Sequence, residues 1–189
     1  LSNVHWAPEA QEAQPWLGAL AVASEGESRT ADALAEGLSQ ASNGATTVVS
    51  VPFNSERRWS ARRLRHDGVE RTFVLGAPET IVPHCDDPVE LAEIYRRTSG
   101  GGLRGVLVAE AETLPDAQKP LPPLRAVALV TVADVLRPQV AQAFATMAEL
   151  GVEPKIISGD NPATVTALIS QLGITLQGGG ISGAELEQM

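Results

Sequence analysis

Aromatic residues, cysteine and long apolar runs are all scarce in this sequence. Phenylalanine, tryptophan and tyrosine make up 4% of the 189 residues, so a folded core has to be built mainly from aliphatic side chains. Cys85 has no partner for a disulfide within the chain, which favours a reducing compartment. No apolar stretch approaches the roughly 20 residues that a membrane-spanning helix needs, and no signal peptide is visible at Leu1. We therefore expect this chain not to be inserted in a membrane.

Basic residues are also in the minority. The sequence has 14 lysines and arginines against 23 acidic residues, a formal net charge of -9. Such a balance argues against nucleic-acid binding and against a polybasic membrane surface. The exception is a cluster of arginines that needs a local explanation: Arg57, Arg58, Arg62, Arg63 and Arg65.

Several common site motifs are absent. The sequence contains neither a Gly-x-x-x-x-Gly-Lys-Ser/Thr phosphate loop nor the nucleophile elbow of serine hydrolases. The histidines show no metal-ligand spacing, and His84-Cys85-Asp86-Asp87 is too compact for a tetrahedral cage. We predict no metal site formed by the side chains of this chain.

The first part of the chain predicts helices followed by an antiparallel sheet. We expect residues 1–14 to be irregular, and Thr30 to cap a helix that runs to about Ala41. Asp67-Gly68 between two extended runs is a hairpin signal. The expected helices are 16–23, 30–41, one from Pro78, and 88–98, and the expected strands are 46–51, 60–65, 69–75 and 103–111.

The proline-rich stretch 112–123 has no periodicity and reads as a linker. Beyond it, strands at 126–133 and 152–157 alternate with helices at 137–150 and 162–172, which predicts part of a doubly wound parallel sheet. The predicted fold class is therefore α/β. A domain with a central antiparallel sheet, residues 1–123, is followed by a partial parallel βαβα unit, residues 124–189.

The turn after residue 157 is the first candidate site. Ser158, Gly159 and Asp160 lie between an apolar run and a helix that Pro162 opens, with Asn161 as its N-cap. Free N–H groups at a helix start suit an anion, and a hydroxyl with a carboxylate suits a phosphate and its metal ion. The same composition is also that of a plain strand-to-helix turn.

Asp134 and Arg137 follow the preceding predicted strand. A carboxylate there reaches the same sheet edge as Asp160, where paired carboxylates can hold a cation against a phosphate. The alternative is that Asp134 and Arg137 are an ordinary loop acid and a surface arginine.

The stretch Pro52–Ser60 is the second candidate site. A base can stack on Phe53 while an arginine beside Glu56 meets phosphates. The alternative places Phe53 in the core and the arginines on a solvated face. Gly76 and Ala77 would let the backbone approach a flat ligand, although Gly76–Glu79 is also an ordinary helix start.

Together and in this order, these segments resemble the cytosolic part of P-type ATPases. The segments that carry the resemblance are Pro52–Ser60 for a Pro-Phe-Ser-type stretch, Leu75–Glu79 for Lys-Gly-Ala-Pro-Glu, Leu103-Arg104 for a Leu-Arg pair, Asp134–Arg137 for Asp-Pro-Pro-Arg, and Ser158–Asn161 for Thr-Gly-Asp-Asn. Each is weak alone, but five in the right order are a specific signal. The resemblance extends from about Trp16 to Met189.

The resemblance implies a nucleotide-binding domain with ATP as its ligand. Phe53 would stack on adenine, with Glu56 and Arg58 nearby, and Gly76-Ala77 would form a wall of the pocket. Arg104 would contact the ribose-phosphate part of the nucleotide.

The resemblance also implies part of a phosphorylation domain with a haloacid-dehalogenase-like fold. Ser158, Gly159 and Asp160 would meet the γ-phosphate, and Asp134 with Arg137 would support the closed state. The family passes the γ-phosphoryl of MgATP to an aspartate and couples its hydrolysis to cation transport. The implied location is the cytoplasmic face of a membrane, and the implied partners are transmembrane and actuator domains of the same polypeptide.

Three departures from the family pattern shape this interpretation. Leu75 stands in place of the family lysine, which removes a cation from the nucleotide pocket. Neither the Asp-Lys-Thr-Gly-Thr segment with the phosphorylated aspartate nor the magnesium-binding Gly-Asp-Gly-x-Asn-Asp segment is present. We therefore expect an excised piece that does not hydrolyse ATP alone and holds few of the Mg²⁺ ligands.

Two other functions remain open from the sequence. A soluble phosphatase of the haloacid-dehalogenase type would share the doubly wound core and Ser158, but it needs an Asp-x-Asp nucleophile near the start of its chain, which is not found here. A non-catalytic nucleotide-binding or interaction module is the second alternative.

Overall fold

The computed structural model describes residues 3–8, 10–42, 44–86, 89–99, 103–133, 139–158, 162–174, 181 and 183–186. The chain divides into two compact units. The first unit comprises Leu1–Arg96 and Gly105–Val132, and the second comprises Arg97–Arg104 and Ala133–Met189. Within the described ranges, no helix combines the length and the apolar character that crossing a membrane requires.

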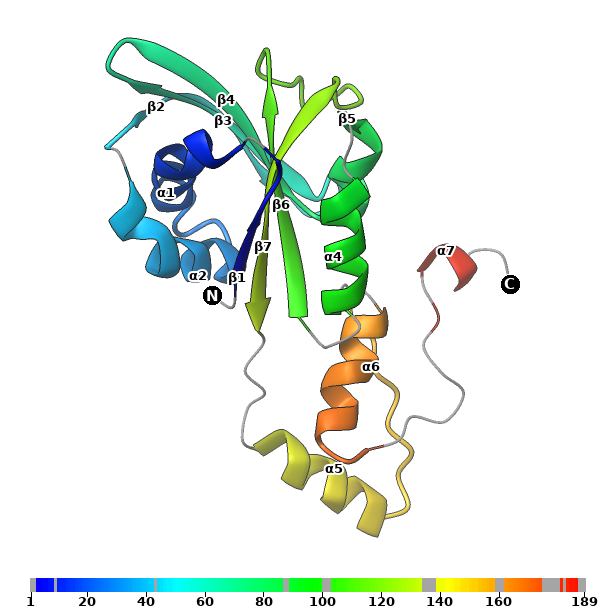
Figure 1. Cartoon of the computed structure of the whole chain (residues 1–189). Coiled ribbons are helices and arrows are strands. Elements are labelled where there is room, and N and C mark those ends of the chain that lie inside the picture. The colour runs from blue at the N-terminus through cyan, green and yellow to red at the C-terminus, as the bar shows by residue number, and fades with distance from the viewer. Residues whose placement is uncertain are drawn as a thin grey trace. The chain divides into compact units, whose positions relative to one another are not determined.

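The first unit is built on one sheet, whose strand order is β1-β7-β6-β4-β3-β2, with β5 beside β7 (Figure 1). The strands are β1 (Asn3–Trp6), β2 (Thr46–Asn54), β3 (Trp59–His66), β4 (Val69–Gly76), β5 (Cys85–Asp86), β6 (Leu103–Ala111) and β7 (Leu124–Ala133). Strands β2, β3, β4 and β6 pair antiparallel in that spatial order. The predicted α/β class with a central antiparallel sheet is confirmed.

The β3–β4 hairpin forms where the sequence predicts it. Its strands pair without interruption from His66 opposite Val69 to Trp59 opposite Gly76. The turn residues Asp67 and Gly68 have φ values of 48° and 78°. Two consecutive positive φ angles match the twist of the flanking strands, and Asp-Gly adopts them at low cost.

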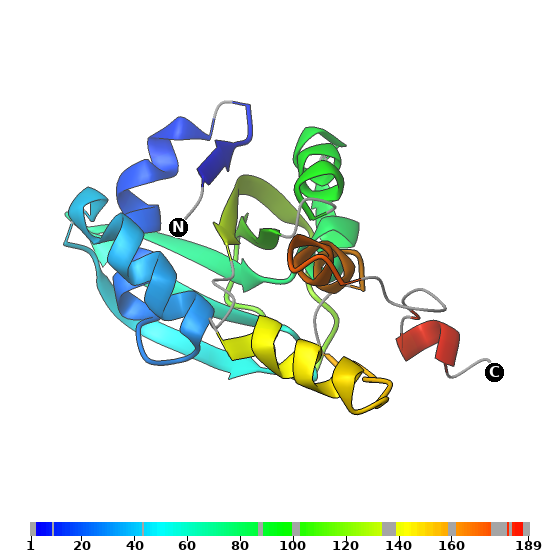
Figure 2. The same ribbon diagram turned by 90° about the horizontal axis from the view of Figure 1, so that it is seen from below.

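One face of the sheet is covered by α1 (Gln14–Ala23) and α2 (Arg29–Leu38), which lie side by side in both views (Figure 1, Figure 2). The ring centroid of Trp16 in α1 lies 6.2 Å from that of Phe73 in β4. Both helices were predicted, but the predicted cap is wrong. Ser28, not Thr30, caps the helix and accepts the hydrogen bond from the Ala31 amide, so the cap lies two residues earlier than predicted.

The opposite face is covered by α4 (Val89–Ser99), which follows the short helices α3 (Pro78–Ile81) and η3 (Val82–His84). A Cβ added to Gly105 in β6 would lie 2.5 Å from the Tyr95 ring of α4. Gly105 and Leu107 lie on the same face of β6. Leu107 pairs with Gly76, which lies on the opposite face of the sheet from Phe73. Helices therefore cover both faces of the sheet around β6.

Two predictions for the first unit are wrong. The segment 1–14 was expected to be irregular, but of its described residues Asn3–Trp6 form β1, which pairs antiparallel with β7, and Gln11–Ala13 form the short helix η1. The strand predicted at 126–133 does not begin a parallel βαβ unit. It belongs to β7, which runs antiparallel to β1 within the sheet of the first unit, and the two-residue strand β5 pairs with β7 in parallel.

The second unit contains α5 (Gln139–Glu149), α6 (Pro162–Gln171) and α7 (Gly183–Leu186). Gly151 and Gly173 follow α5 and α6 with φ values of 69° and 71°, which confirms the predicted helix stops. The predicted strand at 152–157 is not formed, and Ile157 is 98% exposed. A strand needs a paired neighbour, and the preceding strand β7 is part of the sheet of the first unit.

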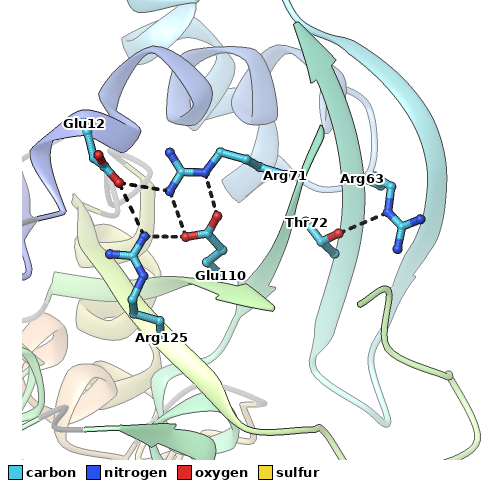
Figure 3. Close-up of polar contacts among 6 residues, drawn as sticks. All are labelled: Glu12, Arg63, Arg71, Thr72, Glu110 and Arg125. Carbon is cyan, nitrogen blue, oxygen red and sulfur yellow. Dashed lines mark hydrogen bonds and ion pairs between the residues drawn. The ribbon is translucent and has the colours of Figure 1, made fainter. Parts of the chain in front are cut away.

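Four charged side chains tie β4, β6, β7 and η1 together (Figure 3). Arg71 donates from Nε and Nη2 to the two carboxylate oxygens of Glu110, at 2.6 and 2.8 Å. Arg125 also pairs with Glu110, and Glu12 lies 3.5 Å from Arg71 and 3.8 Å from Arg125. Because Arg71 and Glu110 are mostly buried, this network fixes the strands more firmly than an exposed pair could.

Glu110 is held in its ionised form. Burial by itself raises the pKa of its carboxyl, but the hydrogen bonds and charges of Arg71 and Arg125 outweigh burial, and the pKa lies below the ordinary value of 4.5. A lowered folded-state pKa stabilises the protein above the unfolded-state value, and the stabilisation is lost as the pH falls through the folded-state pKa.

We predict that Glu110→Gln lowers the free energy of unfolding by about 1–2 kcal/mol at pH 7, because both arginines lose a charged acceptor. The difference between the wild type and the variant should shrink as the pH falls below 4.5. Urea unfolding at pH 7, 4 and 3 measures this. Glu153→Gln, which removes an exposed partner of Lys155, is the control and should change stability little. A difference that stays constant with pH would contradict the role given to the ionised carboxylate.

Candidate functional site

The turn between β2 and β3 is organised by Asn54. Its side-chain oxygen accepts hydrogen bonds from the backbone N–H groups of Glu56 and Arg57, at 2.8 and 3.2 Å. Its backbone carbonyl accepts from the N–H of Arg58 at 2.7 Å. Arg58 adopts a φ of 61°, a left-handed conformation that is costly for a residue with a long side chain. The candidate residues Glu56 and Arg58 are therefore held on a closed, tightly bonded turn.

Phe53 lies immediately before this turn and is exposed. The pairing register between β2 and β3 shifts between Val51 and Asn54, so β2 carries one residue more than β3 over this stretch. Such a bulge re-aims the side chains that it contains. The Phe53 side chain is 44% exposed. The alternative interpretation of Phe53 as a core residue is wrong, and an exposed ring beside cationic side chains suits a flat ligand.

Gly76 and Ala77, at the end of β4, pack directly on the same turn. A Cβ at Gly76 would lie 2.4 Å from the carbonyl oxygen of Arg58 and 2.8 Å from Cα and Cβ of Trp59. The N–H of Ala77 donates to the same Arg58 carbonyl at 3.0 Å. The structure therefore brings Gly76 and Ala77 against the backbone of the turn that carries Glu56 and Arg58.

The Arg58 side chain faces α3. Its Nη2 lies 3.9 Å from the carboxylate of Glu79, and the two side chains are 45% and 37% exposed. The Tyr95 hydroxyl donates to the same carboxylate at 2.6 Å. An ion pair of this length and exposure contributes little to stability, so the guanidinium of Arg58 stays accessible to an anionic ligand.

The other members of the arginine cluster have local partners. Arg62 is buried and pairs with Glu27, and its Nε donates to the Ser24 hydroxyl at 3.2 Å. Arg65 pairs with Glu70 across the hairpin. Arg63 donates to the Thr72 hydroxyl at 3.2 Å (Figure 3). These contacts are the local explanation that the cluster requires.

The remaining candidate residues are not part of the β2–β3 turn. Leu75 is 8% exposed and belongs to the hydrophobic core of the first unit. Arg104 lies near the start of β6, in the part of that strand that belongs to the second unit. Ser158 is exposed and follows the non-strand segment 152–157. The predicted residues Asp134, Arg137, Gly159 and Asp160, with the predicted cap Asn161, lie outside the described residues.

A cavity of about 540 Å³ lies at the C-terminal end of β6. Its lining includes Asp86, Glu110, Glu112 and Arg125, and none of the predicted site residues. Since Glu110 and Arg125 already pair with each other, their charges are largely satisfied within the protein. Among the described residues, no group of three or more histidine, cysteine or acidic side chains is arranged to hold a metal ion.

Sequence reasoning gave no separate role to Arg57. Its Nη2 donates to the carbonyl oxygen of Pro52 at 2.7 Å, and its guanidinium carbon lies 4.9 Å from the ring centroid of Trp59. The sequence does place an arginine two residues before a tryptophan. The stacking depends, however, on the bulge and on the turn, which the sequence did not indicate.

No family model matches the chain, but a number of curated proteins do. It is 33% identical over 128 residues to a probable cation-transporting ATPase of Streptococcus pneumoniae, covering 67% of this chain and 15% of that protein. It is 30% identical over 159 residues to the calcium-transporting ATPase CtpE of Mycobacterium bovis, covering 84% and 19%. A human calcium-transporting ATPase, type 2C member 1, is 28% identical over 157 residues, covering 73% and 16%. The chain thus spans less than a fifth of the length of these relatives.

We predict that Gly76→Ala destabilises the protein by about 2–3 kcal/mol, because the new methyl group would overlap the backbone of Arg58 and Trp59. Urea unfolding followed by circular dichroism measures the loss. Gly183→Ala is the matched control, since a Cβ there would meet no atom within 4 Å. Equal stability of the two variants would show that the end of β4 does not depend on this close approach.

Proposed function

Because this chain is homologous over most of its length to the cation-transporting P-type ATPases, we propose that its first unit is an ATP-binding domain and that its second unit is part of the phosphorylation domain. The observation that carries the proposal is the exposed Phe53 ring beside the cationic β2–β3 turn, on which the Gly76–Ala77 corner packs.

The purine side of the proposed site is Phe53 with the Gly76–Ala77 corner. Stacking of a base on an exposed aromatic ring contributes about 1–3 kcal/mol and tolerates any base. The space that Gly76 leaves is filled by the backbone of Arg58 and Trp59, so we propose that the Gly76–Ala77 corner forms a wall of the pocket by supporting this turn. Glu56 is exposed on the same turn, and we propose that it offers a polar group to the edge of the purine.

The phosphate side of the proposed site begins with Arg58. Its guanidinium is exposed, and its ion pair with Glu79 is long and therefore weak. A phosphate can therefore compete with Glu79 for the guanidinium. Arg104 is proposed to contact the ribose-phosphate part, as the family resemblance implies. Leu75 has an uncharged side chain that is buried in the core, so we propose that Arg58 carries more of the phosphate binding than it would beside a lysine.

For the whole protein, we propose the reaction of the family. The γ-phosphoryl of MgATP passes to an aspartate, and its hydrolysis drives cation transport at a membrane whose cytoplasmic face carries these domains. Ser158, Gly159 and Asp160 are proposed to meet the γ-phosphate, with Asp134 and Arg137 supporting the closed state. Transmembrane and actuator domains of the same polypeptide are the proposed partners, and Mg²⁺ arrives with the nucleotide. We propose that this chain alone binds ATP without hydrolysing it.

The test is binding of adenosine and ATP to the chain, measured by calorimetry with Mg²⁺ present. Phe53→Ala should weaken both ligands by about tenfold or more, because it removes the stacking surface. Arg58→Ala should weaken ATP by about threefold to tenfold and leave adenosine unchanged, because the lost contact is to phosphate at an exposed position.

The matched control is Val49→Ala, another exposed apolar residue of β2. It should leave both affinities within about twofold of the wild type. No binding of either ligand at millimolar concentration, or equal binding by Phe53→Ala, would overturn the proposal. The unfolding midpoint of each variant verifies that a loss of affinity is not a loss of fold.

A further inference from the structure

Arg57 is the one residue of the cluster whose guanidinium is fixed between a backbone carbonyl and an aromatic ring within its own turn. Its Nη2 donates to the Pro52 carbonyl at 2.7 Å, and its guanidinium carbon lies 4.9 Å from the ring centroid of Trp59. Trp59 is 4% exposed and cannot move without repacking the core. The guanidinium therefore links an immobile ring in β3 to the backbone of β2.

The Pro52 carbonyl belongs to the peptide unit that leads into Phe53. A peptide unit is planar, so a hydrogen bond that fixes its oxygen also fixes the direction in which the next residue leaves. This unit lies within the bulge between Val51 and Asn54, where the regular ladder does not determine the orientation of the backbone. Arg57 thus fixes the peptide unit from which Phe53 extends.

The position of Arg57 is not the one that satisfies its own hydrogen-bonding groups best. Its Nε is buried and has no hydrogen-bond partner within the described part of the chain. A buried donor without an acceptor is unfavourable, so the bond to Pro52 and the stacking on Trp59 have to outweigh it. The arrangement therefore fixes the Pro52 carbonyl, although it leaves the Arg57 Nε without an acceptor among the described residues.

We propose that Arg57 is a positioning residue for Phe53, holding the ring where a purine stacks, and does not itself bind phosphate. The inference rests on the proposed nucleotide-binding function. It assigns the neighbouring arginines to different parts of the ligand. Arg57 acts on the base through Phe53, and Arg58, whose guanidinium is exposed, meets the phosphates.

The test compares adenosine with ATP as ligands of Arg57→Ala. Because only the base is affected, both affinities should fall by the same factor, about threefold to tenfold, a part of what removal of the ring itself costs. Combined with Phe53→Ala, the Arg57 substitution should have no further effect, within about twofold, because the ring that it positions is gone. Arg57→Lys, which keeps a donor for Pro52 but not the planar stack, should recover part of the affinity.

A readout without ligand separates this inference from the proposed function. The ring resonances of Phe53 in the nuclear magnetic resonance spectrum should shift in Arg57→Ala and not in the control Arg65→Ala, whose partner Glu70 lies on the opposite end of the hairpin. Resonances that do not shift would overturn the inference even if ATP binds.

Three binding results would also overturn it. The first is a loss of affinity for ATP alone, which would make Arg57 a phosphate ligand. The second is a loss that persists in the Phe53→Ala background, which would show that Arg57 does not act through the ring. The third is an unchanged affinity for both ligands. If the wild-type protein binds neither ligand, the proposed function fails and the assignment to purine binding fails with it.

Discussion

The close approach of β4 to the start of β3 is the constraint on which the candidate site depends. Gly76 has no side chain, so the backbone of Arg58 and Trp59 can lie against it, and the Ala77 amide then bonds to the Arg58 carbonyl. This contact fixes one side of the β2–β3 turn, while Asn54 fixes the other through two backbone amides. The left-handed conformation of Arg58 is maintained because the turn is held from both sides.

Charged residues have two distinct roles in the first unit. Arg71, Glu110 and Arg125 are paired around one mostly buried carboxylate, and their charges are satisfied within the protein. Arg58 at the β2–β3 turn is exposed and only loosely paired. A protein of net charge -9 repels an anionic nucleotide at long range, so such an accessible guanidinium gives local attraction where the rest of the surface does not.

The sequence predicts the local structure better than the pairing of the strands. Asp67-Gly68 determined the β3–β4 hairpin because its turn geometry depends on those residues alone. The strand at 126–133 is predicted to lie in a parallel sheet because strands and helices alternate from there on. Its continuous apolar run is the pattern of any strand buried on both faces. β7 has the same burial as the centre of an antiparallel sheet, so the sequence could not distinguish the alternatives.

The candidate site shows the same limit. Gly76 and Arg58 could be singled out from their motifs, but the exposure of Phe53 accompanies the outer position of β2, whose residues are nearly all exposed, and no local pattern encodes that position. The role of Arg57 depends on the register between β2 and β3, since it needs Pro52 and Trp59 brought to either side of one guanidinium. Properties that arise from how two strands are aligned appear only once the strands are paired.

The outer position of β2 bears on how copies of the protein behave in concentrated solution. An open strand edge offers evenly spaced peptide groups on which another chain can assemble. In the described part of the chain, the β2 register is irregular at Thr47/Val49 and again at Val51/Asn54, and Pro52 has no amide hydrogen to offer. The irregularities of β2 therefore discourage the assembly of one molecule on the next along the edge where Phe53 is exposed.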